Sequence, residues 1–95
     1  PAARVTRLHA PHPNPFNPAT TVAFELATPG RASLTVYALD GRRVARLVDG
    51  DLAAGSHRAV WRGRDDAGRP VSSGTYLVQL RAPDRTESQR LTLVK

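Results

Sequence analysis

Cysteine and methionine are both missing from this sequence, and its only aromatic residues are one tryptophan, two tyrosines and two phenylalanines. Without cysteine no disulfide cross-links the chain, and no redox compartment can be inferred. The 95 residues are expected to form one domain that buries about 60–65% of its unfolded surface, enough for stability without a disulfide or a metal. The scarce aromatic side chains offer no obvious stacking platform for nucleic-acid bases.

Long hydrophobic runs are missing too. No apolar segment approaches the roughly 20 residues of a membrane-spanning helix, and no N-terminal stretch has the pattern of a signal peptide. The sequence starts at Pro1 and not at a methionine. We therefore expect it to be a fragment of a larger parent protein.

Acidic residues are few: eight Asp and Glu stand against fourteen Lys and Arg, and the net charge is +6 with a pI near 11.3. Such a balance favours nucleic acid, an acidic polysaccharide or an anionic membrane as a partner. The arginines, however, are spread along the chain, and their densest groups are residues 42–46 and 58–64. We therefore predict a solvated basic surface and no specific nucleic-acid binding.

Apolar and polar residues alternate in several short segments, which is the period of half-buried β-strands. These segments are residues 22–26, 33–37, 57–61, 76–80 and 91–93, with an ambiguous strand at 44–48 and a further candidate at 5–8. No helical period of useful length appears. The pattern predicts an all-β fold, a small antiparallel β-sandwich of about seven strands. Its predicted core comprises Phe24, Leu34, Val36, Trp61, Tyr76, Val78 and Leu91.

Turn-forming residues separate these segments. Asp40-Gly41 suits a tight hairpin because glycine accepts a positive φ without steric cost. Gly, Asp and Ser gather in residues 49–55 and 63–74, which predicts a loop and a long turn region there.

Prolines recur between Pro11 and Pro15, where they remove backbone donors and keep the chain extended. We predict that residues 1–13 form a linker or extended leader and residues 14–95 the domain. A proline-rich ligand for another domain is the alternative. Asn14 and Asn17 each precede a proline, which favours turns stabilised by their side chains, and Phe16 is expected to anchor this segment against the sandwich.

Catalytic constellations are not evident in the sequence. Ser56 and His57 are neighbours, but adjacent residues of a strand point to opposite faces, so this pair does not bring a nucleophile to its base. His9 and His12 lie in the leader without further ligands for a metal. We therefore predict no enzyme activity, no metal site and no cofactor.

Two further kinds of site have weaker support in the sequence. The loop aspartates are possible calcium ligands, but Asp65-Asp66-Ala67-Gly68 lacks the acid spacing of an EF-hand loop, and turn formation explains it more simply. Trp61 and Tyr76 are possible sugar-stacking residues, but both fall on apolar faces and are better explained as core.

Several short motifs follow one another in a defined order. They are Asn-Pro-Phe-Asn-Pro-Ala-Thr-Thr at 14–21, Val-Tyr at 36–37, Asp-Gly-Arg at 40–42, Ala-Gly-Ser-His at 54–57, Trp61, Gly-Arg at 68–69, Ser-Gly-Thr-Tyr at 73–76 and Lys95. The set resembles the type A C-terminal sorting domain of the type IX secretion system of Bacteroidetes-like bacteria. It is also similar to the immunoglobulin-like domain of flagellar hook-capping proteins. The resemblance covers about residues 14–95 and implies an immunoglobulin-like β-sandwich.

The resemblance also implies a function. The parent protein would enter the periplasm by its own N-terminal signal, and the sorting domain would then direct it through the outer membrane to the cell surface or the medium. The implied partners are the outer-membrane translocon and a surface sortase, with the parent coupled to an anionic lipopolysaccharide and the domain itself a monomer. The candidate sorting-signal residues are Gly74, Tyr76, Arg90, Leu93, Val94 and Lys95.

A final strand that ends on Lys95 suggests how such a signal is recognised. Free main-chain groups at its edge, together with a terminal carboxylate, would suit strand addition or carboxylate capture. The competing interpretation is that Leu91 and Leu93 only complete the sheet. Two other functions remain open: a structural immunoglobulin-like accessory module, and a carbohydrate-binding module of a multidomain extracellular enzyme.

Overall fold

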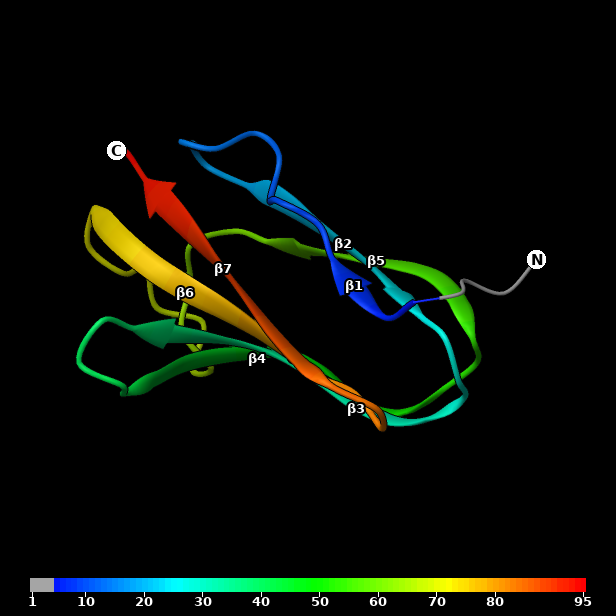
Figure 1. Cartoon of the computed structure of the whole chain (residues 1–95). Helices are drawn as coiled ribbons and strands as arrows, with labels where there is room; N and C mark the ends of the chain where they lie inside the picture. The colour runs from blue at the N-terminus through cyan, green and yellow to red at the C-terminus, as the bar shows by residue number, and fades with distance from the viewer. Residues whose placement is uncertain (1–4) are drawn as a thin grey trace.

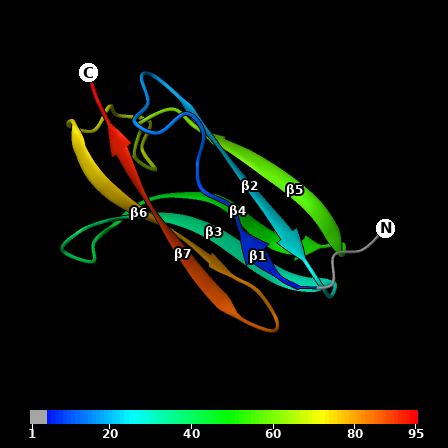
Figure 2. The same cartoon turned by 45° about the horizontal axis from the view of Figure 1, so that its top comes forward.

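The computed structural model describes residues 5–95, which form seven strands and contain no helix. The strands are β1 (Arg7–Leu8), β2 (Thr20–Leu26), β3 (Gly30–Ala38), β4 (Arg43–Leu52), β5 (Gly55–Trp61), β6 (Gly74–Arg81) and β7 (Thr86–Leu93). They pair antiparallel in two sheets, with the orders β1-β2-β5 and β4-β3-β6-β7. The two sheets face each other in Figures 1 and 2. The prediction of an all-β sandwich of about seven strands is confirmed, and this part of the chain has no helix that could cross a membrane.

The core lies between the sheets and follows the alternation seen in the sequence. In β2 every second residue from Thr20 to Leu26 is buried, while the residues between them are partly exposed. All seven residues predicted for the core are buried, and Phe16, Val22, Leu26, Leu80 and Leu93 lie with them. Burying apolar area on this scale is the main stabilising contribution in a domain without disulfides.

The pairing of strand β4 explains why the sequence pattern did not indicate which side chains of residues 44–48 point into the core. Its register with β3 shifts between Leu34 and Thr35, and again between Val36 and Tyr37. Each shift places an extra residue in β4, as in a β-bulge, and interrupts the period of two. Val44 and Ala45 are therefore both buried although they are consecutive.

The same strand is longer than expected. Residues 49–52, predicted as part of a loop, continue β4 and pair with β3 from Gly30 to Ser33. The prediction of a loop over residues 49–51 is wrong, because turn-forming residue types were given more weight than the pairing available along β3. In contrast, residues 63–73 form the predicted long turn between β5 and β6.

The described part of the leader, residues 5–13, packs on the sandwich. Arg7 and Leu8 pair with Glu25 and Phe24 of β2, so the candidate strand at residues 5–8 is present as β1. Leu8 is 2% exposed, and Thr6 is buried with its Oγ1 donating to Asp84 Oδ1 at 2.7 Å. Residues 1–4 of the predicted leader lie outside the described residues.

Candidate interaction site at one end of the sandwich

The loop before β2 is fastened to the end of β7. Phe16 N donates to Thr92 O at 2.9 Å, and Phe16 O accepts from Val94 N at 3.0 Å. The Asn14 side chain extends this pairing: its Nδ2 donates to Arg90 O at 3.1 Å, and its Oδ1 accepts from Thr92 N at 2.9 Å. The Asn14 amide thus mimics one peptide unit of a neighbouring strand.

This pairing corrects two expectations. The edge of β7 was expected to offer free main-chain groups for strand addition, but from Arg90 to Val94 its outer donors and acceptors are engaged by Asn14 and Phe16. Asn14 was expected to stabilise a local turn, whereas its side chain contacts a strand 76 and 78 residues away in the sequence. An edge that is already paired is protected from addition of another strand.

Three aromatic rings hold this end of the sandwich together. The Phe16 and Trp61 centroids are 5.5 Å apart with an interplanar angle of 55°, and Trp61 meets Tyr76 edge-on at 5.2 Å and 75°. Trp61 Nε1 donates to Arg64 O at 2.9 Å, and Tyr76 OH donates to Ser72 O at 2.6 Å. The rings are buried and their polar atoms are satisfied, which confirms the core assignment over a sugar-stacking platform.

Gly63 brings the turn after β5 against the end of β7. It has φ of +69°, and a Cβ at this position would lie 3.2 Å from Leu93 Cδ2 and 3.8 Å from Pro18 O. Its carbonyl oxygen accepts from Val71 N at 3.0 Å. Both the positive φ and the close approach require glycine at this position.

A hollow of about 210 Å³ opens beside this contact. It is lined by Asn17, Pro18, Arg62, Gly63, Arg64, Pro70, Leu93 and Lys95. Arg62, Arg64 and Lys95 are exposed cations, and no acidic side chain lines the hollow in the described part of the chain. Arg64 Nη1 donates to Gly68 O at 2.9 Å, which positions its guanidinium group, and Lys95 N donates to Ser73 Oγ at 3.0 Å, which positions the main chain of Lys95.

The six candidate sorting-signal residues occupy different environments. Tyr76 and Leu93 are buried, and Gly74 pairs with Leu93 at a φ of 156°. Val94 and Lys95 are exposed just beyond β7. Arg90 is exposed opposite Leu77 of β6 and does not line the hollow.

The structure joins two of these candidates, Leu93 and Lys95, to residues that the sequence analysis did not select. Arg62 and Arg64 belong to the Trp-Arg-Gly-Arg turn after β5, and the sequence indicated them only as members of the arginine group at residues 58–64. A pair of arginines around a glycine was the available signal. That these arginines lie next to Leu93 and Lys95, about thirty residues later, follows from the strand pairing and could not be predicted from their spacing in the sequence.

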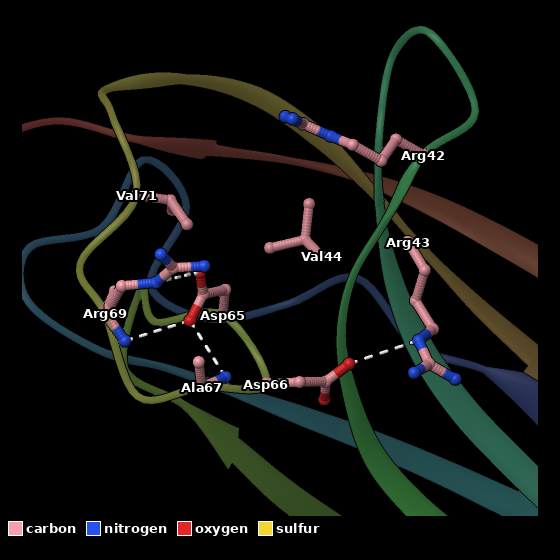
Figure 3. A pocket seen from close by; sticks show the side chains of 8 residues that line it. All are labelled: Arg42, Arg43, Val44, Asp65, Asp66, Ala67, Arg69 and Val71. Carbon is pink, nitrogen blue, oxygen red and sulfur yellow. Dashed lines mark hydrogen bonds and ion pairs between the residues drawn. The ribbon is translucent and has the colours of Figure 1, made fainter.

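A second hollow of about 340 Å³ lies between the β3–β4 turn and the turn between β5 and β6, and Figure 3 shows its lining side chains. Asp65 Oδ1 accepts from Ala67 N at 3.0 Å and Arg69 N at 2.9 Å. The Arg69 backbone N–H is the main cause of a lowered pKa of Asp65, with the Ala67 N–H and the Arg69 guanidinium adding to it against partial desolvation. Asp66 pairs with Arg43 Nε at 3.1 Å.

These contacts assign the turn aspartates a structural role. Asp66 Oδ1 also accepts from Arg46 N at 2.9 Å, which joins the turn to β4. Asp49, in β4, pairs with Arg31 at 3.0 Å and Arg46 at 3.2 Å. Among residues 5–95 no group of three or more potential metal-ligating side chains comes together.

The serine and histidines noted in the sequence lie elsewhere. His57 is stacked on Phe24 with centroids 5.4 Å apart, and its Nε2 lies 2.7 Å from Ala53 O. Ser56 is exposed, and its burial differs from that of His57 as expected for neighbours on a strand. His9 Nε2 lies 3.2 Å from Glu25 Oε2 across the β1–β2 pair.

Sheets of three and four antiparallel strands packed around one core define an immunoglobulin-like β-sandwich. The family model of the FlgD Ig-like domain matches residues 14–85, most of the chain, so the chain belongs to this family. The matched range ends before β7 begins, so the whole of β7 and Lys95 lie beyond it. No curated protein matches the sequence significantly.

Two solved structures share the fold. FlgD from P. aeruginosa is 23% identical with a TM-score of 0.63, and the match covers 96% of this chain and 75% of that one. PorZ of Porphyromonas gingivalis is 19% identical with a TM-score of 0.57 over 95% of this chain. PorZ is described as an essential bacterial surface component of the type IX secretion system, and this chain spans only 11% of its length.

Proposed function

We propose that this module is a C-terminal sorting domain that directs a parent protein across the outer membrane by type IX secretion, for attachment to the cell surface or release. The observation that carries the proposal is the convergence of three of the motifs. The loop at residues 14–18, the Trp61–Gly63 turn and the end of β7 meet at one end of the sandwich, opposite the end at which the described chain begins (Figures 1 and 2). These three motifs are far apart in the sequence, but in the fold they lie next to one another.

Recognition in this proposal depends on side chains. Since the edge of β7 is paired over residues 90–94, the exposed groups left for a translocon are Arg90, Val94 and Lys95 together with the neighbouring Arg62 and Arg64. Leu91 and Leu93 are buried and hold β7 in place. PorZ, which contains a region of this fold, supports the occurrence of such modules in the type IX system.

A reporter fusion tests the proposal. A periplasmic reporter carrying this chain as its last 95 residues is expected to reach the surface or medium of a host with a type IX system. Removing Val94 and Lys95, or adding residues after Lys95, should leave the reporter in the periplasm. Their side chains are exposed, and their loss removes two hydrogen bonds, from Val94 N to Phe16 O and from Lys95 N to Ser73 Oγ, but no core residue, so it should affect recognition more than folding. Gly74→Val and Tyr76→Ala should impair folding and export together, because Gly74 has a positive φ and Tyr76 is in the core.

The control for this experiment is Arg7→Gln, an exposed substitution on β1 at the other end of the sheet, which should be exported like the wild type. Thermal unfolding of each purified variant separates a recognition defect from a folding defect. If the truncated and intact fusions are exported equally, the sorting function is wrong.

A structural accessory module is the second candidate, and the family match favours it. The matched family is the Ig-like domain of FlgD, and the match does not depend on the residues at the end of β7. In this role the sandwich is a spacer or assembly module within a larger protein. The expected result is then a fusion that folds, remains in the periplasm and is unaffected by changes at Val94 and Lys95.

A further inference from the structure

We propose that the hollow bounded by Arg62, Arg64 and Lys95 binds a carboxylate side chain in an acidic segment of a partner protein. The inference goes beyond the proposed function and does not depend on it, since both a sorting domain and a spacer module meet partner proteins. Its test in solution does not involve export, so the two ideas can fail separately.

The charge of the hollow is the first argument. Three side-chain cations from two segments, the turn after β5 and the end of β7, line about 210 Å³ with no acidic side chain among the lining residues that the structure describes. In the 95-residue chain Lys95 also carries a main-chain carboxylate, one negative charge against three positive ones, so the hollow remains net positive. Elsewhere in residues 5–95 several arginines are neutralised: Arg31 and Arg46 by Asp49, Arg43 by Asp66, and Arg69 by Asp65. Grouped like charges raise each other's energy, and an anion placed between them relieves this repulsion.

The rigidity of the hollow is the second argument. Gly63 rests against Leu93, the carbonyl of Arg64 is held by Trp61 Nε1, and Arg64 Nη1 is held by Gly68 O. Lys95 is positioned by its main-chain bond to Ser73 Oγ. A ligand therefore meets cations on a fixed backbone, which lowers the ordering cost of binding.

The rest of the lining favours a peptide over a bare inorganic ion. Pro18, Pro70 and Leu93 supply apolar surface for the carbon chain of an acidic residue. Asn17 places an exposed amide beside them that suits the main chain of a peptide. The planar guanidinium groups match a carboxylate with two parallel hydrogen bonds, the pattern by which arginine clusters recognise acidic motifs.

The experiment is an NMR titration of the whole isotope-labelled 95-residue chain. The probe is an acetylated and amidated hexapeptide with two adjacent glutamates between leucines, and its partner replaces both glutamates with glutamines. We expect the glutamate peptide to shift the amide signals of Asn17, Gly63 and Lys95, and the glutamine peptide to bind roughly tenfold more weakly or not at all. Raising the salt concentration to about 0.5 M should weaken the binding of the glutamate peptide, because screening shortens the range of the electrostatic attraction.

Matched variants locate the site. Arg62→Gln and Lys95→Gln are each expected to lower the affinity for the glutamate peptide roughly fivefold. Arg7→Gln removes the same charge from an exposed site on β1, and its affinity should stay within about twofold of the wild-type value. The altered side chains are exposed, so the folds should be retained, and the wild-type shift map tests the site without any variant. Sodium phosphate and sodium acetate are titrated in parallel.

Four results would overturn the proposal: equal binding of the two peptides, shifts that map away from the hollow, phosphate binding as tight as that of the peptide, or no shifts with any probe. The third result would indicate a general anion site in place of a peptide site.

Discussion

At the scale of single residues, Trp61 connects the core to the candidate interaction site. Its ring is 2% exposed and contacts both Phe16 and Tyr76, while its Nε1 holds the turn that carries Arg62 and Arg64. One side chain therefore contributes apolar burial and also determines the path of the chain at the hollow.

Replacing Trp61 with alanine should lower the free energy of unfolding by about 3–5 kcal/mol, since a large cavity forms and the bond to Arg64 O is lost. Urea unfolding followed by circular dichroism measures the change. In the wild type the tryptophan emission should be shifted to the blue relative to free indole in water. A fluorescence maximum typical of fully hydrated indole in the folded domain would contradict the core assignment.

Asp65 yields a prediction about pH. The hydrogen bond from the Arg69 backbone N–H lowers its pKa in the folded state, so its contribution to stability is present above the ordinary pKa and is lost as the pH falls through the lower folded value. A carboxyl-detected NMR titration should give a midpoint below the ordinary value for Asp. Arg69→Ala should preserve most of this lowering, because the backbone donor remains. Complete recovery of the ordinary value in that variant would show that the guanidinium is the dominant cause.

At the scale of elements, the loop before β2 acts as a short additional strand on β7. Two main-chain bonds from Phe16 and two side-chain bonds from Asn14 pair with residues 90–94. The outer edge of the four-stranded sheet is thus covered at this end, a common way of protecting a sheet edge from unwanted association.

Asn14→Ala should lower the free energy of unfolding by about 1–2 kcal/mol, since two partly exposed hydrogen bonds are lost. The Thr92 amide should exchange with solvent faster, because its acceptor Asn14 Oδ1 is removed. Asn17→Ala is the matched control, being an exposed asparagine that also precedes a proline. Equal exchange at Thr92 in both variants would show that the Asn14 clamp does not hold β7.

At the scale of the whole molecule, a net charge of +6 is distributed over several surfaces and partly neutralised by ion pairs. The aromatic rings of Phe16, Trp61 and Tyr76 are inside the sandwich, where bases cannot stack on them.

We therefore expect only weak, nonspecific binding to nucleic acid. Fluorescence anisotropy with a labelled oligonucleotide should show an affinity that falls steeply between about 50 and 200 mM salt, as counterion release requires. Two unrelated sequences should bind equally. Sequence-selective, salt-resistant binding in the nanomolar range would restore nucleic acid as a partner.

Most of the architecture could be predicted from local pattern. Alternation identified β2, β5, β6 and the last three residues of β7 together with their inward faces, because a strand places successive side chains on opposite sides. The pattern failed in β4, where bulges put Val44 and Ala45 on the same side, and at residues 49–52, where pairing with β3 outweighed turn propensity.

The sequence by itself determined the fold class and the identity of most of the core, both of which depend on side-chain size, polarity and short-range geometry. Only the tertiary structure decided which distant residues meet. Asn14 reaches β7 and Arg62 lies near Lys95 because strand pairing and the packing of the two sheets bring the loop before β2 and the turn after β5 to the end of β7. Spacing along the sequence does not show which distant segments meet in the fold. The covered edge of β7 and the cationic hollow beside it therefore appear only in the folded molecule.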